Sequence, residues 1–473
     1  MSGLFSRQTK TVPATPAATK PAGDRAVVSA GGHRLGPIVG QVESTNIRFR
    51  LRDTVLVVGA PGSGKTSGIV IPYVADSAGA VVTSSTRPDV LRATGAIRER
   101  LGKVHVADFE GLSRWPHALR WDMVAGCTEP ASATARASGM VAAAPRAGRP
   151  DRTSAFFEGG CRIILQGLFH AASLKPGGSM VDVIKWALNF DDKTPANIIA
   201  GSSSPVQAWA DELHRWCRGK ADETRAGLEM TLSTLIGPML DSRVLEQLCP
   251  GPGALNIDDF LTSTDTLYCL TRASINSSTA PIVTALVESI YQRGILLSGA
   301  SRTGKLSPEM TFVLDEVANT APLPSLQSLM SEGGGNGFHT MALSQGFSQF
   351  TDRWGSETAE TIWQSSTAKI FFGASSEDKL LEKVAGLIGK EWTQHTSASS
   401  NSGQSGIGSS GVSTSMHLDY RLRPDEIRKV PEGQALLLYK ELDEILNVPY
   451  WFDRADADRF AASQTHILGI EGL

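Results

Sequence analysis

Short apolar runs alternate with helical segments in the first part of the chain. Apolar, β-rich runs occupy residues 54–58, 80–83 and 104–107, and the stretches between them, 67–74 and 88–101, are predicted helices. Strands that alternate with helices over such distances are typical of a parallel sheet with crossover helices. The pattern therefore predicts an α/β fold.

The hydrophobic pattern changes between residues 129 and 248. Segments in this region have helical spacing and few strand signals, and glycine and proline separate them. The segments are 131–144, 156–172, 180–187, 205–217 and 225–239. We interpret this region as an all-α domain inserted into the α/β fold.

Strand-like runs return after the insertion. They lie at 266–270, 311–314, 339–343, 368–372 and 435–438, with predicted helices at 281–297 and 379–388. Residues 393–415 consist mostly of Ser, Gly, Thr and Asn, which favours a flexible loop. The predicted division is a disordered tail (1–30), the first α/β part (31–128), the all-α domain (129–250), the second α/β part (251–455) and a C-terminal tail (456–473).

A glycine-rich loop follows the first apolar run and precedes a predicted helix. Glycines let successive backbone N–H groups face an anion, and the helix adds its positive N-terminal end. The lysine can reach the β- and γ-phosphates, and the threonine hydroxyl can bind Mg²⁺. The spacing predicts a nucleoside-triphosphate site made by Gly59, Ala60, Pro61, Gly62, Ser63, Gly64, Lys65, Thr66 and Ser67.

Two adjacent carboxylates end the apolar run at 311–314. We assign Asp315 to Mg²⁺, through water, and Glu316 to the general base that activates the attacking water. Adjacent Asp and Glu favour ATP hydrolysis over a GTPase switch. Gln345 follows the next predicted strand, where it either senses the γ-phosphate or is an ordinary surface glutamine.

Composition limits the remaining possibilities. The net charge of −3 leaves no global basic surface, so nucleic acid would need a local patch or a pore formed by oligomerisation. The five cysteines show no metal spacing and fit a reducing cytoplasm. The sequence has no apolar stretch of roughly 18 residues, so it predicts no membrane-spanning helix.

The order of these motifs resembles the VirD4/TraG/TraD family of coupling-protein ATPases from conjugation and type IV secretion, particularly actinobacterial versions. The resemblance rests on Val55–Pro72 (VLVVGAPGSGKTSGIVIP), Val81–Leu91, Thr311–Phe350 (TFVLDEVANTAPLPSLQSLMSEGGGNGFHTMALSQGFSQF), Trp354–Gly389 and Tyr420–Tyr450. It spans about residues 50–452. It implies a RecA-like nucleotide-binding domain interrupted by an all-α domain, ATP and Mg²⁺ as ligands, and a hexameric ring with sites between subunits.

The resemblance also implies partners: a relaxase-bound single DNA strand, or effector proteins, and the proteins of a type IV secretion channel. Family members commonly begin with transmembrane helices, whereas this sequence predicts none. We expect either a cytoplasmic chain recruited to the membrane by partners or a part of a longer protein. The family often has an Asp-Pro-Lys-Gly-like loop where this chain has Ser84–Pro88, and an arginine in the turn where it has Gly333–Gly337. The expected arginine finger is therefore assigned to Arg272, with Arg87 and Arg353 as alternatives.

Four functions fit the sequence. The first is a DNA-stimulated motor for conjugative transfer of single-stranded DNA. The others are an ATPase that recruits protein cargo, an FtsK/TraB-like translocase of double-stranded DNA, and a scaffold that binds ATP but turns it over slowly. Intact Lys65, Asp315 and Glu316 argue against the slow scaffold.

Overall fold

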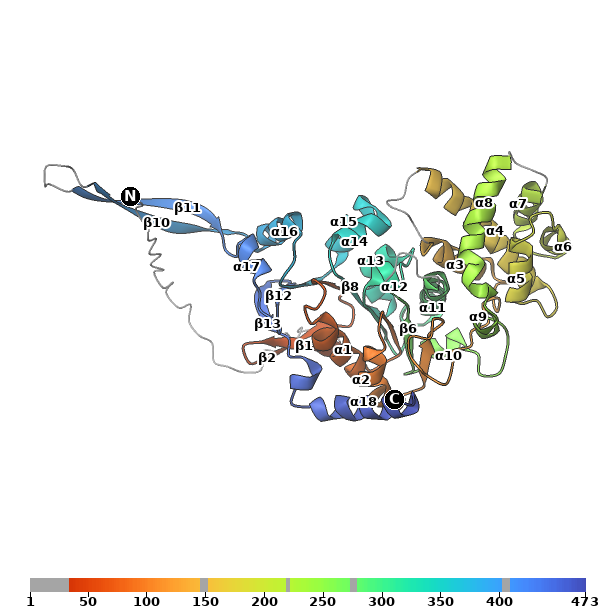
Figure 1. Ribbon diagram of the computed structural model, residues 1–473, viewed down its shortest axis with the longest axis horizontal. Coiled ribbons are helices and arrows are strands. Elements are labelled where there is room, and N and C mark those ends of the chain that lie inside the picture. Colours follow the sequence, from red (N-terminus) through yellow and green to blue (C-terminus); the bar gives the residue numbers. More distant parts are fainter. Residues whose placement is uncertain (1–33, 145–151, 218–221, 273–278, 402–408) are drawn as a thin grey trace.

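A computed structural model describes residues 34–144, 152–217, 222–272, 279–401 and 409–473 (Figure 1). Its centre is a sheet of eleven strands in the order β2-β1-β13-β12-β9-β3-β8-β7-β4-β6-β5. The predicted tail at 1–30 lies outside the described residues. The described part contains no helix long and apolar enough to cross a membrane.

The half of the sheet from β9 to β5 is parallel. The predicted apolar runs form these strands, because a strand covered on both faces needs apolar side chains in both directions. The strands are β3 (Val55–Val58), β4 (Val81–Ser85), β5 (Val104–Ala107), β6 (Thr266–Leu270), β7 (Met310–Leu314), β8 (Phe338–Ser344) and β9 (Ala368–Phe372).

The other edge of the sheet is antiparallel. Strand β12 pairs with β9, β13 pairs with β12, and β1 joins β13 to β2. These strands are β1 (Leu35–Val42), β2 (Thr45–Arg50), β12 (Gln434–Tyr439) and β13 (Leu442–Asn447). The chain thus returns, after residue 430, to the side of the sheet that holds β3.

Two hydrophobic clusters cover the two faces of the sheet. In β3, Leu56 and Val58 belong to one cluster and Val55 and Val57 to the other, as strand alternation requires. Helices η1 (Thr66–Val70), α1 (Ile71–Asp76) and α2 (Asp89–Glu99) join the second cluster. The first contains α11 (Ala280–Ala300), α12 (Val317–Thr320), α13 (Leu326–Asn336), α14 (Ser348–Trp354), α15 (Ser356–Ser365), α16 (Asp378–Ile388) and α17 (Pro424–Arg428).

Helices without strands fill the described chain between β5 and β6, and most of them gather beside the sheet domain (Figure 1). Apolar side chains from several of them share the first cluster, so the insertion packs on the sheet domain through a continuous core. The fold is the predicted α/β fold with an inserted all-α domain. Its helices are α3 (Pro130–Ala142), α4 (Arg152–Leu174), α5 (Met180–Ala187), α6 (Thr194–Ala200), α7 (Gln207–Cys217), α8 (Asp222–Ile236), η2 (Gly237–Leu240), α9 (Ser242–Gln247) and α10 (Ile257–Leu261).

The segment expected to be a flexible loop, 393–415, contains strands instead. Strands β10 (Lys390–Asn401) and β11 (Ser409–Tyr420) pair in register as a long hairpin that projects from the sheet domain (Figure 1). Backbone pairing satisfies N–H and C=O groups whatever the side chains, so a Ser/Gly-rich composition does not exclude a hairpin. Trp392 faces Leu418 across it, and their side chains are 66% and 49% exposed.

The segment expected to be a C-terminal tail also differs, because it forms helix α18 (Ala457–Ile470). Phe460 and Ile467 are fully buried against the second cluster. Glu471 accepts a hydrogen bond from Arg92 of α2 at 2.7 Å. Helix α18, which follows η3 (Trp451–Asp453), therefore belongs to the core of the sheet domain.

The glycines expected in a turn before β8 lie mostly within α13, and the helix ends at Asn336 before Gly337. A Cβ atom at Gly334 would lie 1.9 Å from the Arg52 carbonyl oxygen. Glycine is therefore required because the helix and the chain before β3 approach backbone to backbone. Gly337 has a φ of 90°, a conformation that glycine adopts at helix ends.

Candidate nucleotide-binding site

The glycine-rich loop lies at the carboxyl end of β3, between β8 and β9. Gly62 and Gly64 have φ angles of 76° and 89°, which L side chains rarely adopt. No atom lies within 4 Å of a Cβ built on Gly62. These φ angles let the loop curl tightly, as an anion cradle requires, and open space lies beside Gly62.

The helix after the loop begins with a wide turn. Thr66–Val70 is π-helical, and the Ile71 N–H donates to the Thr66 carbonyl oxygen. Pro72 explains this turn, because it has no N–H to donate to the carbonyl of Gly68. The wide turn places Thr66 and Ser67 at the mouth of the loop, and both are partly exposed.

Lys65 is buried under the loop. Its ammonium donates hydrogen bonds to the carbonyl oxygens of Gly59 and, at 3.0 Å, Ala60. Burial lowers the pKa of Lys65, while the neighbouring Asp315 and Glu316 raise it. The charge of Lys65 is thus held where the phosphate chain would enter.

Thr66 and Asp315 meet across 249 residues of sequence. The Thr66 hydroxyl donates to Asp315 Oδ2 at 2.8 Å, and Asp315 Oδ1 has no hydrogen-bond partner. Burial raises the pKa of Asp315 to about 6, although the hydrogen bond from Thr66 and the charge of Lys65 oppose this. A hydroxyl and a carboxylate with a spare oxygen fit a magnesium ion.

Glu316 and Gln345 form the second pair. Gln345 Nε2 donates to Glu316 Oε1 at 2.7 Å, while the buried Oε2 has no partner. Glu316 has a φ of 51°, which is uncommon for a residue with a side chain and occurs at functional sites. The amide orients one carboxylate oxygen and leaves the other available.

Residues that the sequence pattern did not indicate support this pair of strand ends. The Thr320 hydroxyl lies 2.8 Å from both the Asp315 carbonyl oxygen and Ser84 Oγ, and Ser84 donates to the same carbonyl at 3.1 Å. Glu377 accepts from the N–H groups of Phe347 and Ser348, in the turn that follows Gln345 and Gly346. The spacing of Thr320, one helical turn after Glu316, is the only sequence feature that could have indicated it. No sequence feature near Glu377 indicates its role.

The three arginines considered for the finger lie in different settings. Arg272 follows β6, is 67% exposed and pairs with Glu110 at 3.2 Å. Arg353 donates to the Ala142 carbonyl oxygen, which ties it to the end of α3. Arg87 is exposed in the loop after β4. Strands β7 and β4 separate β6 from β8, so Arg272 lies along the same sheet edge as the loop but several strands away.

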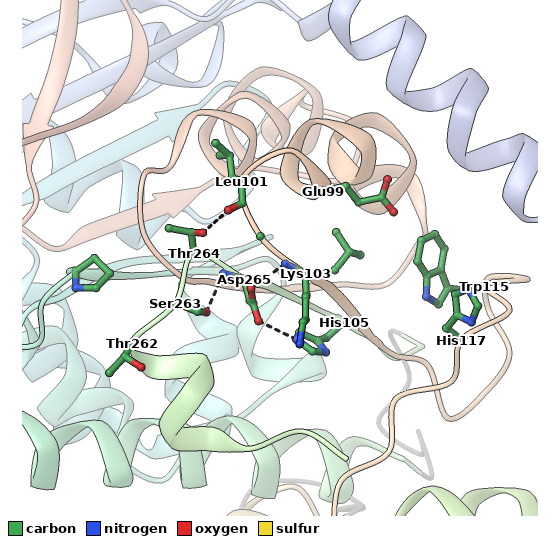
Figure 2. A pocket seen from close by; sticks show the side chains of 13 residues that line it. Glu99, Leu101, Lys103, His105, Trp115, His117, Thr262, Ser263, Thr264 and Asp265 are labelled. Carbon is green, nitrogen blue, oxygen red and sulfur yellow. Dashed lines mark hydrogen bonds and ion pairs between the residues drawn. The ribbon is translucent and has the colours of Figure 1, made fainter. Parts of the chain in front are cut away.

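A pocket of about 970 Å³ lies at the opposite end of the parallel strands (Figure 2). It is lined by residues that precede β5, β6 and β7, such as Lys103 and Asp265, and by Trp115 and His117. His105 contacts Asp265 at 3.2 Å within it. Because parallel strands place the nucleotide loop at their carboxyl ends, this pocket is not part of that site.

The comparisons with known structures agree with this fold. The coupling protein TrwB with ADP and Mg²⁺ matches with a TM-score of 0.62 at 16% identity, over 91% of this chain and 95% of that one. TrwB with the non-hydrolysable ATP analogue ADPNP matches with a TM-score of 0.60, also at 16% identity, over 92% and 96%. No curated protein matches the chain.

The fold is that of the RecA-like P-loop NTPases. Residues 17–193 match the family model for conjugative DNA transfer by the type IV secretory system. Residues 309–432 match the model for the TraM recognition site of TraD and TraG. The chain belongs to the VirD4/TraG family of type IV secretion coupling proteins, as the resemblance in its sequence indicated.

Proposed function

We propose that this chain hydrolyses ATP and uses the energy to drive a relaxase-bound single DNA strand toward a conjugative type IV secretion channel. The observation that carries the proposal is the meeting of Thr66 with Asp315 and of Glu316 with Gln345 beside Lys65. Unpartnered oxygens on both carboxylates support ligand binding there. TrwB, a plasmid coupling protein of the same fold, was solved with ADP and Mg²⁺ and with analogues of ATP and GTP.

Each residue has a distinct role in the proposed reaction. Gly59–Ser67 would bind the phosphates, and Lys65 would neutralise charge on the β- and γ-phosphates. Thr66 and, through water, Asp315 would hold Mg²⁺, which when bound offsets the charge of the triphosphate. Glu316 takes a proton from water while the water oxygen bonds to the γ-phosphorus. The bond to the bridging oxygen breaks, and ADP and phosphate leave; Gln345 orients Glu316.

We further propose that the active form is a hexameric ring. In such a ring Arg272 of one subunit would stabilise the γ-phosphate charge at its neighbour's site. Its 67% exposure and its place at the carboxyl end of β6 support this role, because it would only have to leave Glu110. Partner proteins would hold the cytoplasmic chain, with its all-α domain at 129–250, at the membrane.

ATPase assays with and without DNA test the motor function. Phosphate release should be slow for the chain alone and rise severalfold with single-stranded DNA. Greater stimulation by double-stranded DNA would favour the double-strand translocase. No stimulation by either would favour recruitment of protein cargo. Lys65→Ala should abolish turnover in every condition, and turnover that survived it would contradict the assigned site.

A further inference from the structure

The segment after β13 runs directly along the nucleotide loop. A Cβ atom at Gly64 would lie 2.4 Å from Tyr450 Cε1 and 2.9 Å from its hydroxyl oxygen. One at Gly68 would lie 2.7 Å from Val448 Cγ1 and 3.7 Å from Tyr450 Cδ1. The Tyr450 ring therefore rests against the backbone of the loop and the first turn of its helix, more than 380 residues away in sequence.

The segment is held firmly at both ends. The Val448 N–H donates to the Gly433 carbonyl oxygen at 2.7 Å, and the Asp453 N–H donates to the Tyr450 carbonyl oxygen at 2.9 Å. Trp451 packs on Phe460 of α18, with ring centroids 6.0 Å apart. Tyr450 is thus a preorganised side chain, and ordering it costs little when a ligand binds.

Tyr450 and Phe452 together present aromatic surface beside the loop. Their ring centroids lie 5.3 Å apart. Phe452 is 52% exposed and Tyr450 is partly exposed. Two neighbouring aromatic rings held in place offer a flat apolar surface on which a planar group can stack, which favours a ligand at this place.

The position of the rings relative to the loop identifies the ligand group. The loop and Lys65 fix the phosphate end of a nucleotide, so the nucleoside must extend from the α-phosphate past Thr66 and Ser67, at the start of the helix. Tyr450 borders this helix start at Gly64 and Gly68. We propose that Tyr450, flanked by Phe452, is the platform on which the nucleobase stacks.

This inference rests on the proposed function and adds a base subsite to it. The ligand class is the base of a nucleoside triphosphate, recognised by its flat face. Every base has such a face, so stacking discriminates weakly between adenine and guanine. The contrasting role for Tyr450 is support of the loop backbone, and a ligand that has phosphates but no base separates the two roles.

The test compares ATP with inorganic tripolyphosphate, both with Mg²⁺, by calorimetry on the full chain. Tyr450→Leu, which keeps apolar cover over Gly64, should weaken ATP binding by roughly tenfold, the size of one stacking contact. Its affinity for tripolyphosphate should stay within about twofold, and Tyr450→Phe should bind both like the wild type. Trp392→Ala on the distant hairpin is the matched aromatic control.

Two results would overturn the base subsite but leave the proposed function intact. An equal loss for ATP and tripolyphosphate would assign Tyr450 to loop support, and unchanged ATP affinity would show that the base does not touch it. Wild-type chain that bound neither probe would overturn the proposed function, and the base subsite with it.

Discussion

Asp315, a proposed functional residue, lowers the stability of the folded chain without ligand because its carboxylate is buried. Its side chain is buried at the end of β7, and burial raises its pKa to about 6 from the usual 3.8. Only one oxygen has a partner, the Thr66 hydroxyl. A buried carboxylate that is half satisfied costs free energy in the folded chain, which a bound cation would offset.

Asp315→Asn should therefore stabilise the chain without ligand at high pH. The folded-state pKa of Asp315 lies above its unfolded value, so the native state binds more protons between pH 3.8 and 6. Stability is then lost as the pH rises through this window, by roughly 2–3 kcal/mol at completion. Urea denaturation at pH 8 should show the variant more stable by up to that amount. The gain should vanish near pH 4; an equal gain at both pH values would contradict a titration effect.

Glu316→Gln should separate binding from hydrolysis. The new side-chain oxygen can still accept the hydrogen bond from Gln345, but the amide cannot take a proton from water. Turnover should fall by about 100-fold or more, while ATP affinity stays within a few-fold. Phosphate release and binding of a fluorescent ATP analogue measure the two quantities. Normal turnover in this variant would show that Glu316 is not the general base.

Local sequence predicted some of these residues and not others for a physical reason. Asp315 follows one apolar strand directly and Lys65 ends the glycine-rich loop after another, so the strand pattern places both at one edge of a sheet. Tyr450 reaches the loop only because the chain returns through two antiparallel strands. No local pattern encodes that return, and the contact depends on pairing between distant segments.

At the scale of elements, apolar runs identified the parallel strands because those strands are buried on both faces. The hairpin β10–β11 escaped prediction because its Ser- and Thr-rich strands have the composition of a disordered linker. What holds it is cross-strand register, a property of the pair that neither strand shows alone.

Helix α18 should contribute strongly to stability, although its sequence suggested a tail. Ile467 is fully buried, and its Cδ1 would lie 2.9 Å from a Cβ atom on Gly95 of α2. Ile467→Ala should lower the free energy of unfolding by about 2–4 kcal/mol, measured by urea denaturation. Ile470→Ala, on the same helix but partly exposed, is the control and should cost much less. Equal small losses would mean that α18 is only loosely docked.

At the scale of the whole molecule, the strand order separates the proposed nucleotide-binding residues from the proposed arginine finger. Lys65, Asp315 and Glu316 gather where β3 and β7 end, whereas Arg272 follows β6 and pairs with Glu110. An arginine several strands from Lys65 is poorly placed to reach the same subunit's phosphates. It is better placed to face a neighbour, and catalysis would then depend on assembly.

A mixing experiment decides whether Arg272 acts between subunits. Lys65→Ala has a defective site but keeps Arg272, while Arg272→Ala keeps its loop but lacks the arginine. Each variant alone should be almost inactive with single-stranded DNA. In mixed rings some Arg272→Ala sites face a Lys65→Ala neighbour that supplies the arginine, so phosphate release should recover to a sizeable fraction of wild type. If Arg272 served its own subunit, no such pairing would restore a complete site and mixing would give no recovery. Arg243→Ala, 86% exposed in the all-α domain, is the matched arginine control and should remain active alone.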